Sequence, residues 1–179
     1  ETINRQIKDI ENLVNEFSNF ARMPRPIMKK INLLDVAKRS IDFIKMTSKN
    51  EINLSSNFKK LFINGDAEQL NRVFINLIKN SEEAFLDLVK KNTDFKGKID
   101  IEITNNNDYI VVILKDNGNG ISDTKKVMTP YFTTKIKGTG LGLPIVNKII
   151  NEHSGDFLLQ NRKDGKGINI EILFPKLNA

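Results

Sequence analysis

An apolar stripe over residues 66–91 constrains the fold more than any other feature of this sequence. Its apolar side chains recur with the period of an α-helix and would cover one face. Asp66 precedes the stripe and Gln69 follows three residues later, which is the spacing of a capping box. The sequence therefore predicts a long helix over 66–91 with one buried face. The residues of the stripe are Leu70, Val73, Phe74, Leu77, Ile78, Ala84, Phe85 and Leu88.

The next segment alternates with the period of a strand. Ile99, Ile101 and Ile103 are separated by polar residues, residues 105–108 form a turn, and residues 109–114 return. This hairpin favours an α+β fold over regular βαβ units: a two-layer α/β sandwich with a mixed, largely antiparallel sheet and helices on one face. Further strands are predicted near 29–32, 51–57, 61–63, 156–161 and 167–174, with helices near 33–47 and 141–153 and a long loop over 116–140.

Residues 2–22 predict one long N-terminal helix, within a partial N-terminal domain over residues 1–24. Its apolar residues are spaced by alternating fours and threes, like a short heptad seam. Such a helix suits an antiparallel hairpin or dimer bundle, or it packs on its own domain. Pro24 and Pro26 end it, since proline lacks an N–H and restricts the residue before it. We expect a linker at 25–28 and a domain over 29–179.

Composition excludes several kinds of site. The chain has no cysteine and one histidine, His153, which excludes disulfides, thiolate zinc sites and multi-histidine metal sites. A net charge of +6 could attract nucleic acid, acidic lipid or a nucleotide. The lysines come in scattered pairs with few aromatic neighbours, so we expect solvated faces and no nucleic-acid partner. No stretch approaches the about 18 consecutive apolar residues of a membrane helix.

Asn76 and Asn80 are the first candidates for chemistry. They are four residues apart on the predicted helix, so they share a face at the rim of the apolar stripe. Amide oxygens are suitable hard ligands for Mg²⁺. A plain polar edge of the helix is the alternative.

A second candidate is Asp116, which opens the segment Asp116-Asn117-Gly118-Asn119-Gly120 directly after an apolar strand. An ionised carboxylate accepts a hydrogen bond from an exocyclic amine such as that of adenine. Gly118 and Gly120 would let the backbone approach a flat base closely. A simple turn after a strand is the alternative.

A third candidate is the glycine-rich segment 137–143, which opens a predicted helix. Its glycines bare backbone N–H groups at a helix N-terminus, a site for phosphate oxygens. A flexible hinge with ordinary capping is the alternative. Residues 128–135 precede this segment, and their aromatics could latch the loop, while Lys135 or Lys137 could meet phosphate charge.

The four segments together, in this order and spacing, resemble the N, G1, F and G2 boxes of the histidine-kinase ATP-binding domain. That family belongs to a superfamily shared with type II topoisomerases, Hsp90-type chaperones and mismatch-repair proteins. The resemblance covers roughly residues 29–175, including a final hairpin with Gly165 and Gly167. Residues 16–24 also resemble the end of the dimerisation hairpin in nitrogen-regulation sensor kinases of the NtrY type.

The resemblance implies ATP and Mg²⁺ as cofactors. Asn80 would bind Mg²⁺ between the phosphates, Asp116 would read the adenine amine, and residues 121–139 would form a mobile lid. Asn76 stands where the topoisomerase and chaperone branches hold a glutamate that activates water, and asparagine is no general base near neutral pH. The implied nucleotide-binding residues are Asn80, Asp116, Gly118, Gly120, Thr134, Lys135, Lys137, Gly138, Thr139, Gly140, Leu141 and Gly142.

The resemblance further implies an ATP-dependent protein-histidine kinase of two-component signalling. The γ-phosphoryl would pass to a histidine outside this chain and then to an aspartate of a response-regulator receiver domain. His153 is expected to be structural, because the family often has a histidine before a glycine at this helix end. A homodimer through the N-terminal hairpin is implied, as is a cytoplasmic domain of a protein anchored in the bacterial inner membrane. An ATP-driven clamp of the chaperone or topoisomerase kind, or a binding module without turnover, is the alternative.

Overall fold

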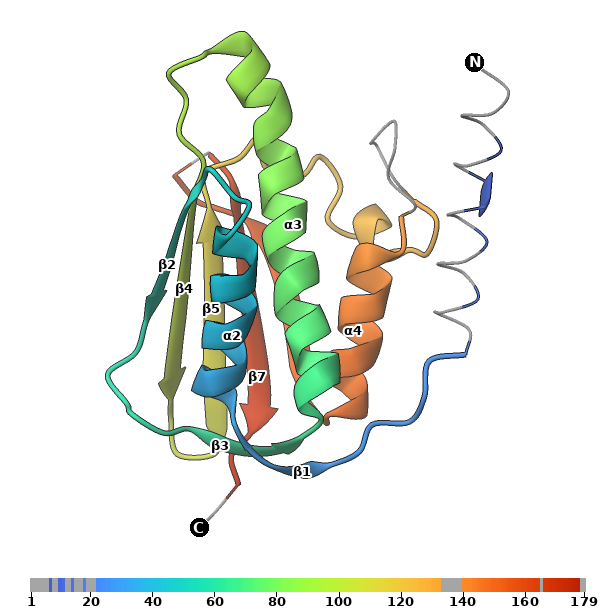
Figure 1. Ribbon diagram of the computed structural model, residues 1–179, viewed down its shortest axis with the longest axis vertical. Coiled ribbons are helices and arrows are strands. Elements are labelled where there is room, and N and C mark those ends of the chain that lie inside the picture. Colours follow the sequence, from blue (N-terminus) through green and yellow to red (C-terminus); the bar gives the residue numbers. More distant parts are fainter. Residues whose placement is uncertain are drawn as a thin grey trace.

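A computed structural model describes residues 7, 10, 11, 14, 18, 22–132, 140–164 and 166–177. Helices cover one face of a mixed sheet in this part of the chain, which confirms the predicted α+β sandwich (Figure 1). The elements are β1 (Lys29–Asn32), α2 (Leu33–Lys45), β2 (Glu51–Ser55), β3 (Phe62–Gly65), α3 (Ala67–Lys91), β4 (Lys98–Asn105), β5 (Tyr109–Asp116), the 3₁₀ turn η1 (Lys126–Met128), α4 (Gly142–Glu152), β6 (Asp156–Asn161) and β7 (Ile168–Pro175).

The main sheet has five strands in the order β2-β4-β5-β7-β6. Only β2 and β4 run parallel, and the other neighbouring pairs are antiparallel. Strands β1 and β3 form a separate antiparallel ribbon at one end of the molecule. In the β4–β5 hairpin Ile101 lies opposite Leu114, and both side chains are buried on the helical face. The alternation read from the sequence is thus the inward face of the sheet.

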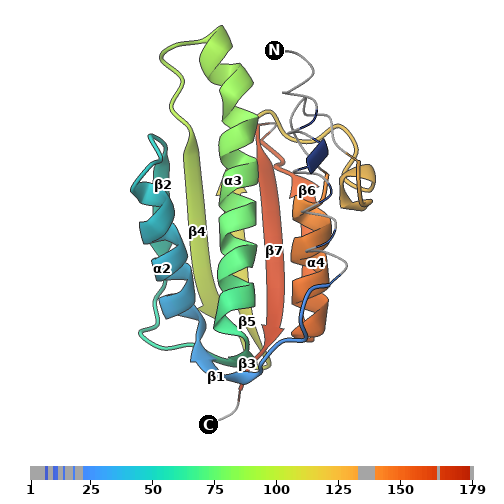
Figure 2. The ribbon, with the colours of Figure 1, turned by 45° about the vertical axis from the view of Figure 1, so that its right-hand side comes forward.

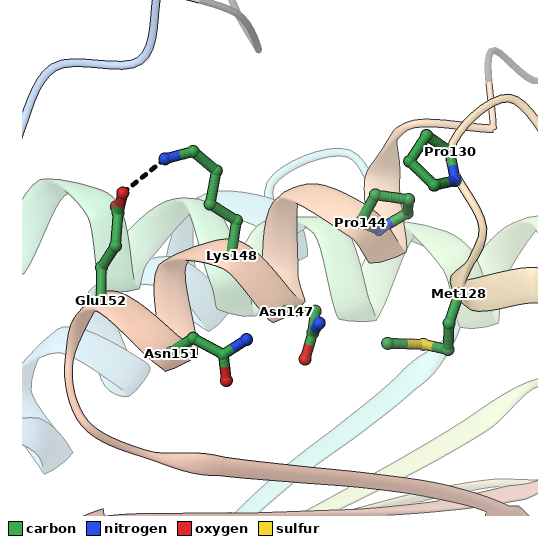
Figure 3. A pocket seen from close by; sticks show the side chains of 7 residues that line it. All are labelled: Met128, Pro130, Pro144, Asn147, Lys148, Asn151 and Glu152. Atoms are coloured by element: carbon green, nitrogen blue, oxygen red, sulfur yellow. Dashed lines mark hydrogen bonds and ion pairs between the residues drawn. The ribbon is translucent and has the colours of Figure 1, made fainter.

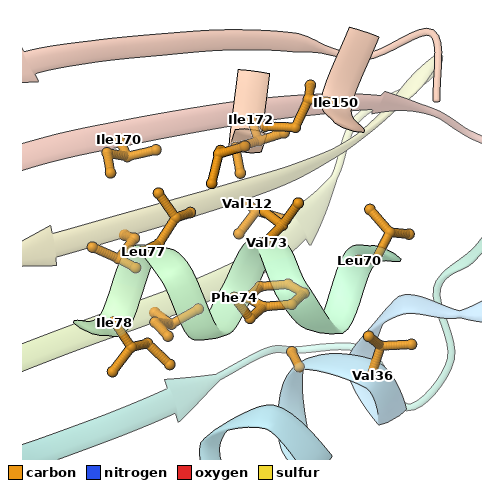
Figure 4. Close-up of a cluster of buried hydrophobic side chains, with 14 of the residues drawn as sticks. Val36, Leu70, Val73, Phe74, Leu77, Ile78, Val112, Ile150, Ile170 and Ile172 are labelled. Atoms are coloured by element: carbon orange, nitrogen blue, oxygen red, sulfur yellow. The ribbon is translucent and has the colours of Figure 1, made fainter. Parts of the chain in front are cut away.

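Helix α3 lies along the middle of the sheet, with α2 on one side and α4 on the other (Figure 2). Six of its eight predicted stripe residues are buried in the core, where Phe74 and Leu77 are 1% exposed, whereas Ala84 and Leu88 are half-buried. Figure 4 shows these side chains between α2 and the strands that carry Val112 and Ile172. Truncating a buried phenylalanine such as Phe74 to alanine costs about 3–5 kcal/mol, so this helix anchors the domain.

Helix α3 begins with the predicted aspartate cap. Asp66 Oδ1 accepts from the backbone N–H groups of Glu68 at 2.9 Å and Gln69 at 3.2 Å. The reciprocal half of the capping box is absent, so that part of the prediction is wrong. Gln69 Nε2 donates to Pro24 O at 2.9 Å instead, and the N–H of Asp66 donates to Nε2 of His153 at 2.9 Å. Tertiary partners therefore replace the local one.

The segment before β1 lies against the start of α3. The N–H of Ile27 donates to Asp66 Oδ2 at 2.8 Å. Among residues 1–21 the structure describes Ile7, Ile10, Glu11, Val14 and Ser18, each helical, so one long N-terminal helix stays a prediction. No helix in the described ranges combines the length and the hydropathy needed to cross a membrane.

Candidate functional site

The structure brings the asparagines of α3 against the first residue of α4. A Cβ atom placed on Gly142 would lie 3.5 Å from Asn80 Nδ2 and 3.9 Å from Asn76 Oδ1. Two of the four predicted segments therefore meet, although Asn80 and Gly142 are 62 positions apart in the chain. A helix N-terminus favours phosphate oxygens, and amide oxygens favour a hard cation, so this junction suits a metal–phosphate group.

Asp116 lies at the end of β5 and is 2% exposed. Its Oδ1 accepts from the N–H of Gly118 at 3.0 Å and from the N–H of Ile168 at 3.1 Å. No described residue donates a hydrogen bond to its Oδ2. The carboxylate is held in one orientation by backbone donors, as a group that reads a ligand must be.

The loop after Asp116 packs against the same helix that carries Asn80. A Cβ on Gly118 would lie 3.2 Å from the Cβ of Ala84, which follows Asn80 by about one turn of α3. The predicted second segment thus faces α3 at a point displaced along the helix from the Gly142 junction. The order along α3 is Asn76, Asn80 and then Ala84, which places the phosphate-type site and the carboxylate side by side.

Asn117, which sequence reasoning did not select, fixes the start of this loop. Its Oδ1 accepts from the N–H of Lys98 at 2.8 Å, and its Nδ2 donates to Lys96 O at 2.9 Å. The side-chain amide therefore extends the β4–β5 ladder by one bridge. No local pattern indicates this role, because an asparagine between a strand and a glycine is typical of any turn.

Asn161, at the end of β6, holds the other end of the loop. Its Oδ1 accepts from the N–H of Ile121 and its Nδ2 donates to Ile121 O, both at 2.7 Å. Arg162 contacts the carbonyl of Asp116. Sequence reasoning missed both residues, since their partners lie 40 and 46 positions away.

Five of the predicted nucleotide-binding residues lie outside the described part of the chain: Thr134, Lys135, Lys137, Gly138 and Thr139. Gly140 borders that segment with φ = +69°, and its carbonyl accepts from the N–H of Tyr131 at 3.1 Å. The side chain of Leu141 is fully buried in the core. A ligand could therefore meet Leu141 only through its backbone.

His153 is part of the core at the opposite end of α4 from Gly142. It is 4% exposed, with Nδ1 2.8 Å from Ile149 O and Nε2 2.9 Å from the N–H of Asp66. A carbonyl requires a donor and an N–H requires an acceptor, so the imidazole is neutral with its proton on Nδ1. The expected structural role of His153 agrees with these contacts.

A hollow of about 500 Å³ lies on the outer side of α4, next to η1 (Figure 3). The ion pair of Lys148 and Glu152 lies on one side of it, and Asn147 and Asn151 lie on the other. None of the predicted site residues lines it, and its walls present one proline and one methionine from the loop. The predicted site residues Asn80, Asp116 and Gly142 lie elsewhere, and size alone does not make this hollow the site.

The donor set of the junction fits a magnesium ion. Among the described residues no group of three or more His, Asp or Glu side chains could enclose a metal. Asn76 and Asn80 offer neutral amide oxygens, and Mg²⁺ takes one or two protein ligands together with substrate phosphates and water. A site of this composition would hold Mg²⁺ in company with a polyphosphate.

Comparison with known families matches residues 65–178 to "Histidine kinase-, DNA gyrase B-, and HSP90-like ATPase", which is more than half of the chain. An NtrY-like sensor histidine kinase of Rickettsia prowazekii is 38% identical over 173 residues, which cover 95% of this chain and 28% of the relative. The nitrogen regulation protein NtrY of Azorhizobium caulinodans is 31% identical, over 96% and 22%. Sporulation kinase C of Bacillus subtilis is 33% identical, over 95% and 39%.

Solved structures of histidine kinases have the same fold as this chain. The catalytic domain of the histidine kinase ThkA, in a nucleotide-free form, superimposes with a TM-score of 0.70 at 28% identity, covering 83% of this chain and 95% of that one. The mycobacterial sensor histidine kinase MprB shares the fold at 19% identity, also with a TM-score of 0.70, over 86% of this chain and 100% of that one. The chain spans about a quarter of the length of the NtrY-type relatives it matches.

Proposed function

Because this chain belongs to the histidine kinase-, DNA gyrase B- and HSP90-like ATPase family, we propose that it binds Mg²⁺-ATP between α3, the 116–121 loop and the start of α4. The observation that carries the proposal is the contact of Gly142 with Asn80, one helix turn from the point where the Asp116 loop packs. On this proposal a cation ligand and phosphate donors lie beside a carboxylate that suits a base.

Each part of the nucleotide has a partner in this arrangement. Asp116 Oδ2 would accept a hydrogen bond from the exocyclic amine of adenine. Its Oδ1 is held by the N–H groups of Gly118 and Ile168. The start of α4 at Gly142 faces the phosphates with its backbone N–H groups and helix dipole. Asn80 would hold Mg²⁺, and the ion would neutralise phosphate charge.

We propose further that the γ-phosphoryl group leaves as part of a kinase reaction rather than hydrolysis. Asn76, whose Oδ1 would lie 3.9 Å from a Cβ atom on Gly142, cannot take a proton from water. A histidine nitrogen of another segment would attack the γ-phosphorus, the bond to the β-phosphate oxygen would break, and ADP would leave. His153 is unsuited to accept the group, because it is buried and both ring nitrogens are hydrogen-bonded.

The relatives named as sensor histidine kinases support the remaining parts of this proposal. Residues 1–24 would be the second helix of a dimerisation and phosphoacceptor hairpin, residues 25–28 a linker, and residues 29–179 the catalytic domain. The phosphoryl group would pass from the hairpin histidine to a response-regulator aspartate. The complete protein would be a homodimer anchored in the bacterial inner membrane, with this domain on the cytoplasmic side.

Calorimetric titration with Mg²⁺-ATP tests nucleotide binding. We expect a Kd in the micromolar to millimolar range, roughly −8 to −4 kcal/mol. Asp116→Asn should weaken binding by tenfold or more. The amide carries no negative charge, and its nitrogen can stand where the amine of the base requires an acceptor. Lys60→Ala, an exposed residue in the connection between β2 and β3, is the control. Equal, negligible effects of the two changes would remove Asp116 from the site.

Phosphate labelling tests the kinase step. With radioactive ATP, the chain alone should bind nucleotide, hydrolyse it slowly and acquire no acid-labile label. A longer chain that includes the hairpin histidine should become labelled, and Asn80→Ala in that chain should abolish the labelling. Acid-labile phosphate on His153 would contradict its structural assignment. Rapid steady hydrolysis by the chain alone would favour the clamp ATPases of the same family.

A further inference from the structure

The turn between β6 and β7 closes around the end of β5. Gly167 has φ = +85°, and a Cβ atom on it would lie 2.0 Å from Asp116 O and 2.7 Å from Asp116 Oδ1. The next residue, Ile168, donates its N–H to that same Oδ1 at 3.1 Å. The two backbones are in direct contact here, and only glycine allows both the approach and the dihedral angle.

Arg162 donates a hydrogen bond to the backbone carbonyl of Asp116, which has no partner in the β5–β7 ladder. The β5–β7 register ends at Lys115 opposite Asn169, so the carbonyl of Asp116 lies beyond the ladder. Arg162 Nη1 donates to that carbonyl at 3.1 Å, and the N–H of Arg162 donates to Gly167 O at 3.1 Å. One residue therefore connects both sides of the contact between the Asp116 loop and the hairpin turn.

The guanidinium of Arg162 is itself held in place. Its Nε donates to Asp164 Oδ1 at 3.0 Å and its Nη2 pairs with the other carboxylate oxygen. The hydrogen bond to Asp164 raises the pKa of Arg162 and lowers the pKa of Asp164, so both groups are charged at neutral pH. This two-point ion pair with Asp164 fixes the plane of the guanidinium. It thereby fixes the direction in which Nη1 donates to the carbonyl of Asp116.

Asn161 completes the arrangement at the far end of the loop. Its side-chain amide forms two 2.7 Å hydrogen bonds with the backbone of Ile121, in the manner of a strand neighbour. A Cβ on Gly120 would lie 2.8 Å from Asn161 Oδ1, so the amide also fills the space beside the loop. Both ends of the 116–121 loop are thus attached to two adjacent residues of the β6–β7 hairpin.

We propose that Asn161 and Arg162 are positioning residues that hold the 116–121 loop in its ligand-ready form and so set the affinity for the adenine part of the nucleotide. The inference rests on the proposed function and names residues that act through Asp116 without touching the phosphates. A loop that is already ordered loses less conformational entropy when the base binds. A loosened loop weakens the binding of the substrate and the binding of the transition state by the same factor, which raises KM and leaves kcat unchanged.

Calorimetry with Mg²⁺-ADP provides the first test. Arg162→Ala should raise the Kd by about tenfold, which corresponds to ~1.4 kcal/mol. Asn161→Asp keeps an acceptor for Ile121 N–H but loses the donor to Ile121 O, and it should raise the Kd by about three- to tenfold. The matched control is Lys163→Ala, an exposed neighbour in the same turn, with an expected change below about twofold. Urea unfolding verifies that each variant is folded at the temperature of the titration.

A longer chain that carries the phosphoacceptor hairpin provides the second test. Arg162→Ala should raise KM for ATP with kcat within about twofold of the unmodified chain. Arg162→Lys restores the charge but not the fork, and it should recover only part of the affinity. Full recovery by lysine, an unchanged Kd in Arg162→Ala, or a fall in kcat at constant KM would each overturn the inference. In each of these outcomes the proposed function still stands if the unmodified chain binds ADP. If the unmodified chain binds no ADP, both the proposed function and this inference are overturned.

Discussion

The backbone N–H of Asp66 donates to Nε2 of His153 at 2.9 Å, which ties the first turn of α3 to the last turn of α4. These helices meet again at Asn80 and Gly142, where the proposed phosphate site lies. The imidazole uses its other nitrogen on Ile149 O of its own helix. The single histidine of the chain therefore sets how α3 and α4 are arranged at the end away from the site.

Replacing His153 should reveal the cost of this contact. His153→Leu leaves the N–H of Asp66 buried without an acceptor, and we expect a loss of about 1–3 kcal/mol in the free energy of unfolding. His153→Gln can place an amide oxygen near the position of Nε2, so it should lose less. Urea denaturation at pH 7 measures both. Equal losses for the two variants would contradict the hydrogen-bond explanation.

Asp66 should make stability depend on pH in the acid range. Burial acts to raise its pKa, but the hydrogen bonds from the N–H groups of Ile27, Gln69 and Glu68 outweigh this, so the pKa is lowered. A lowered folded-state pKa stabilises the protein above the unfolded value of about 3.9, and the contribution is lost as the pH falls through the folded value.

Asp66→Asn gives the measurement for this effect. The unmodified chain should be more stable than the variant by about 0.5–1 kcal/mol at pH 7, since the helix N-terminus favours a negative charge. The difference should shrink as the pH is lowered below about 4. Urea midpoints of both proteins at pH 7, 5, 4 and 3 give the curve, and a difference that grows toward low pH would refute the assignment.

Two buried serines should respond to alanine with opposite signs. Ser81 on α3 is fully buried, and its Oγ has no hydrogen-bond partner among the described residues. Ser40 on α2 is equally buried, but its Oγ bonds to Val36 O at 2.9 Å and Asn71 Oδ1 at 2.6 Å. Ser81→Ala should stabilise by about 1 kcal/mol and Ser40→Ala should destabilise by about as much. Thermal or urea unfolding decides, and destabilisation by Ser81→Ala would mean that its hydroxyl has a partner.

Gly142→Ala should separate binding from stability. The added methyl would stand at ordinary contact distance, 3.5 Å from Asn80 Nδ2, so α4 should form as before or slightly better. That methyl would occupy the space where phosphate and cation meet, and we expect the Kd for Mg²⁺-ATP to rise by about tenfold or more, ~1.4 kcal/mol. Gly167→Ala is the contrasting variant, because its Cβ would clash with Asp116 O and should lower both affinity and stability. Unchanged affinity in Gly142→Ala would remove the start of α4 from the site.

Local patterns predicted much of this fold. The stripe after Asp66 predicts a helix over 66–91, and the structure has α3 at Ala67–Lys91 with that cap. The predicted strands at 29–32 and 156–161 coincide with β1 and β6. Hydrophobic period and turn residues are properties of neighbouring positions, so they can be read from the chain directly.

Features that depend on distant partners were not predicted. The parallel pairing of β2 with β4 joins residues separated by α3, and no local signal marks it. The short turn η1 lies within a stretch predicted as loop, although Asp123 caps it with bonds of 3.0 Å to the N–H groups of Lys125 and Lys126. Gln69 fits the capping-box pattern but bonds to Pro24, because tertiary contacts outweigh the local preference.

Local patterns likewise identify some residues of the candidate site and miss others. Asn76, Asn80, Asp116 and Gly142 carry recognisable chemistry at a recognisable spacing, and the structure brings the two asparagines close to Gly142 and the Asp116 loop close to Ala84 on the same helix. Asn117, Asn161 and Arg162 look like ordinary turn residues, and their importance comes from bonds to backbone far along the chain. The residues expected to touch a nucleotide could therefore be selected from the sequence, whereas those that hold the loop in place could not.

The attachment of the Asp116 loop to the last hairpin also has a consequence for biosynthesis. Asp116 is translated before the residues that hold it, because Arg162 and Ile168 follow it by 46 and 52 positions. A ribosome adds about 5–20 residues per second, so the loop leaves the exit tunnel seconds before its partners do. The growing chain has α3 and the β4–β5 hairpin by then, yet the carboxylate lacks the N–H of Ile168 that orients it. Nucleotide in the cell therefore meets a complete site only after translation has passed the final strand, too late to guide the folding of the first half.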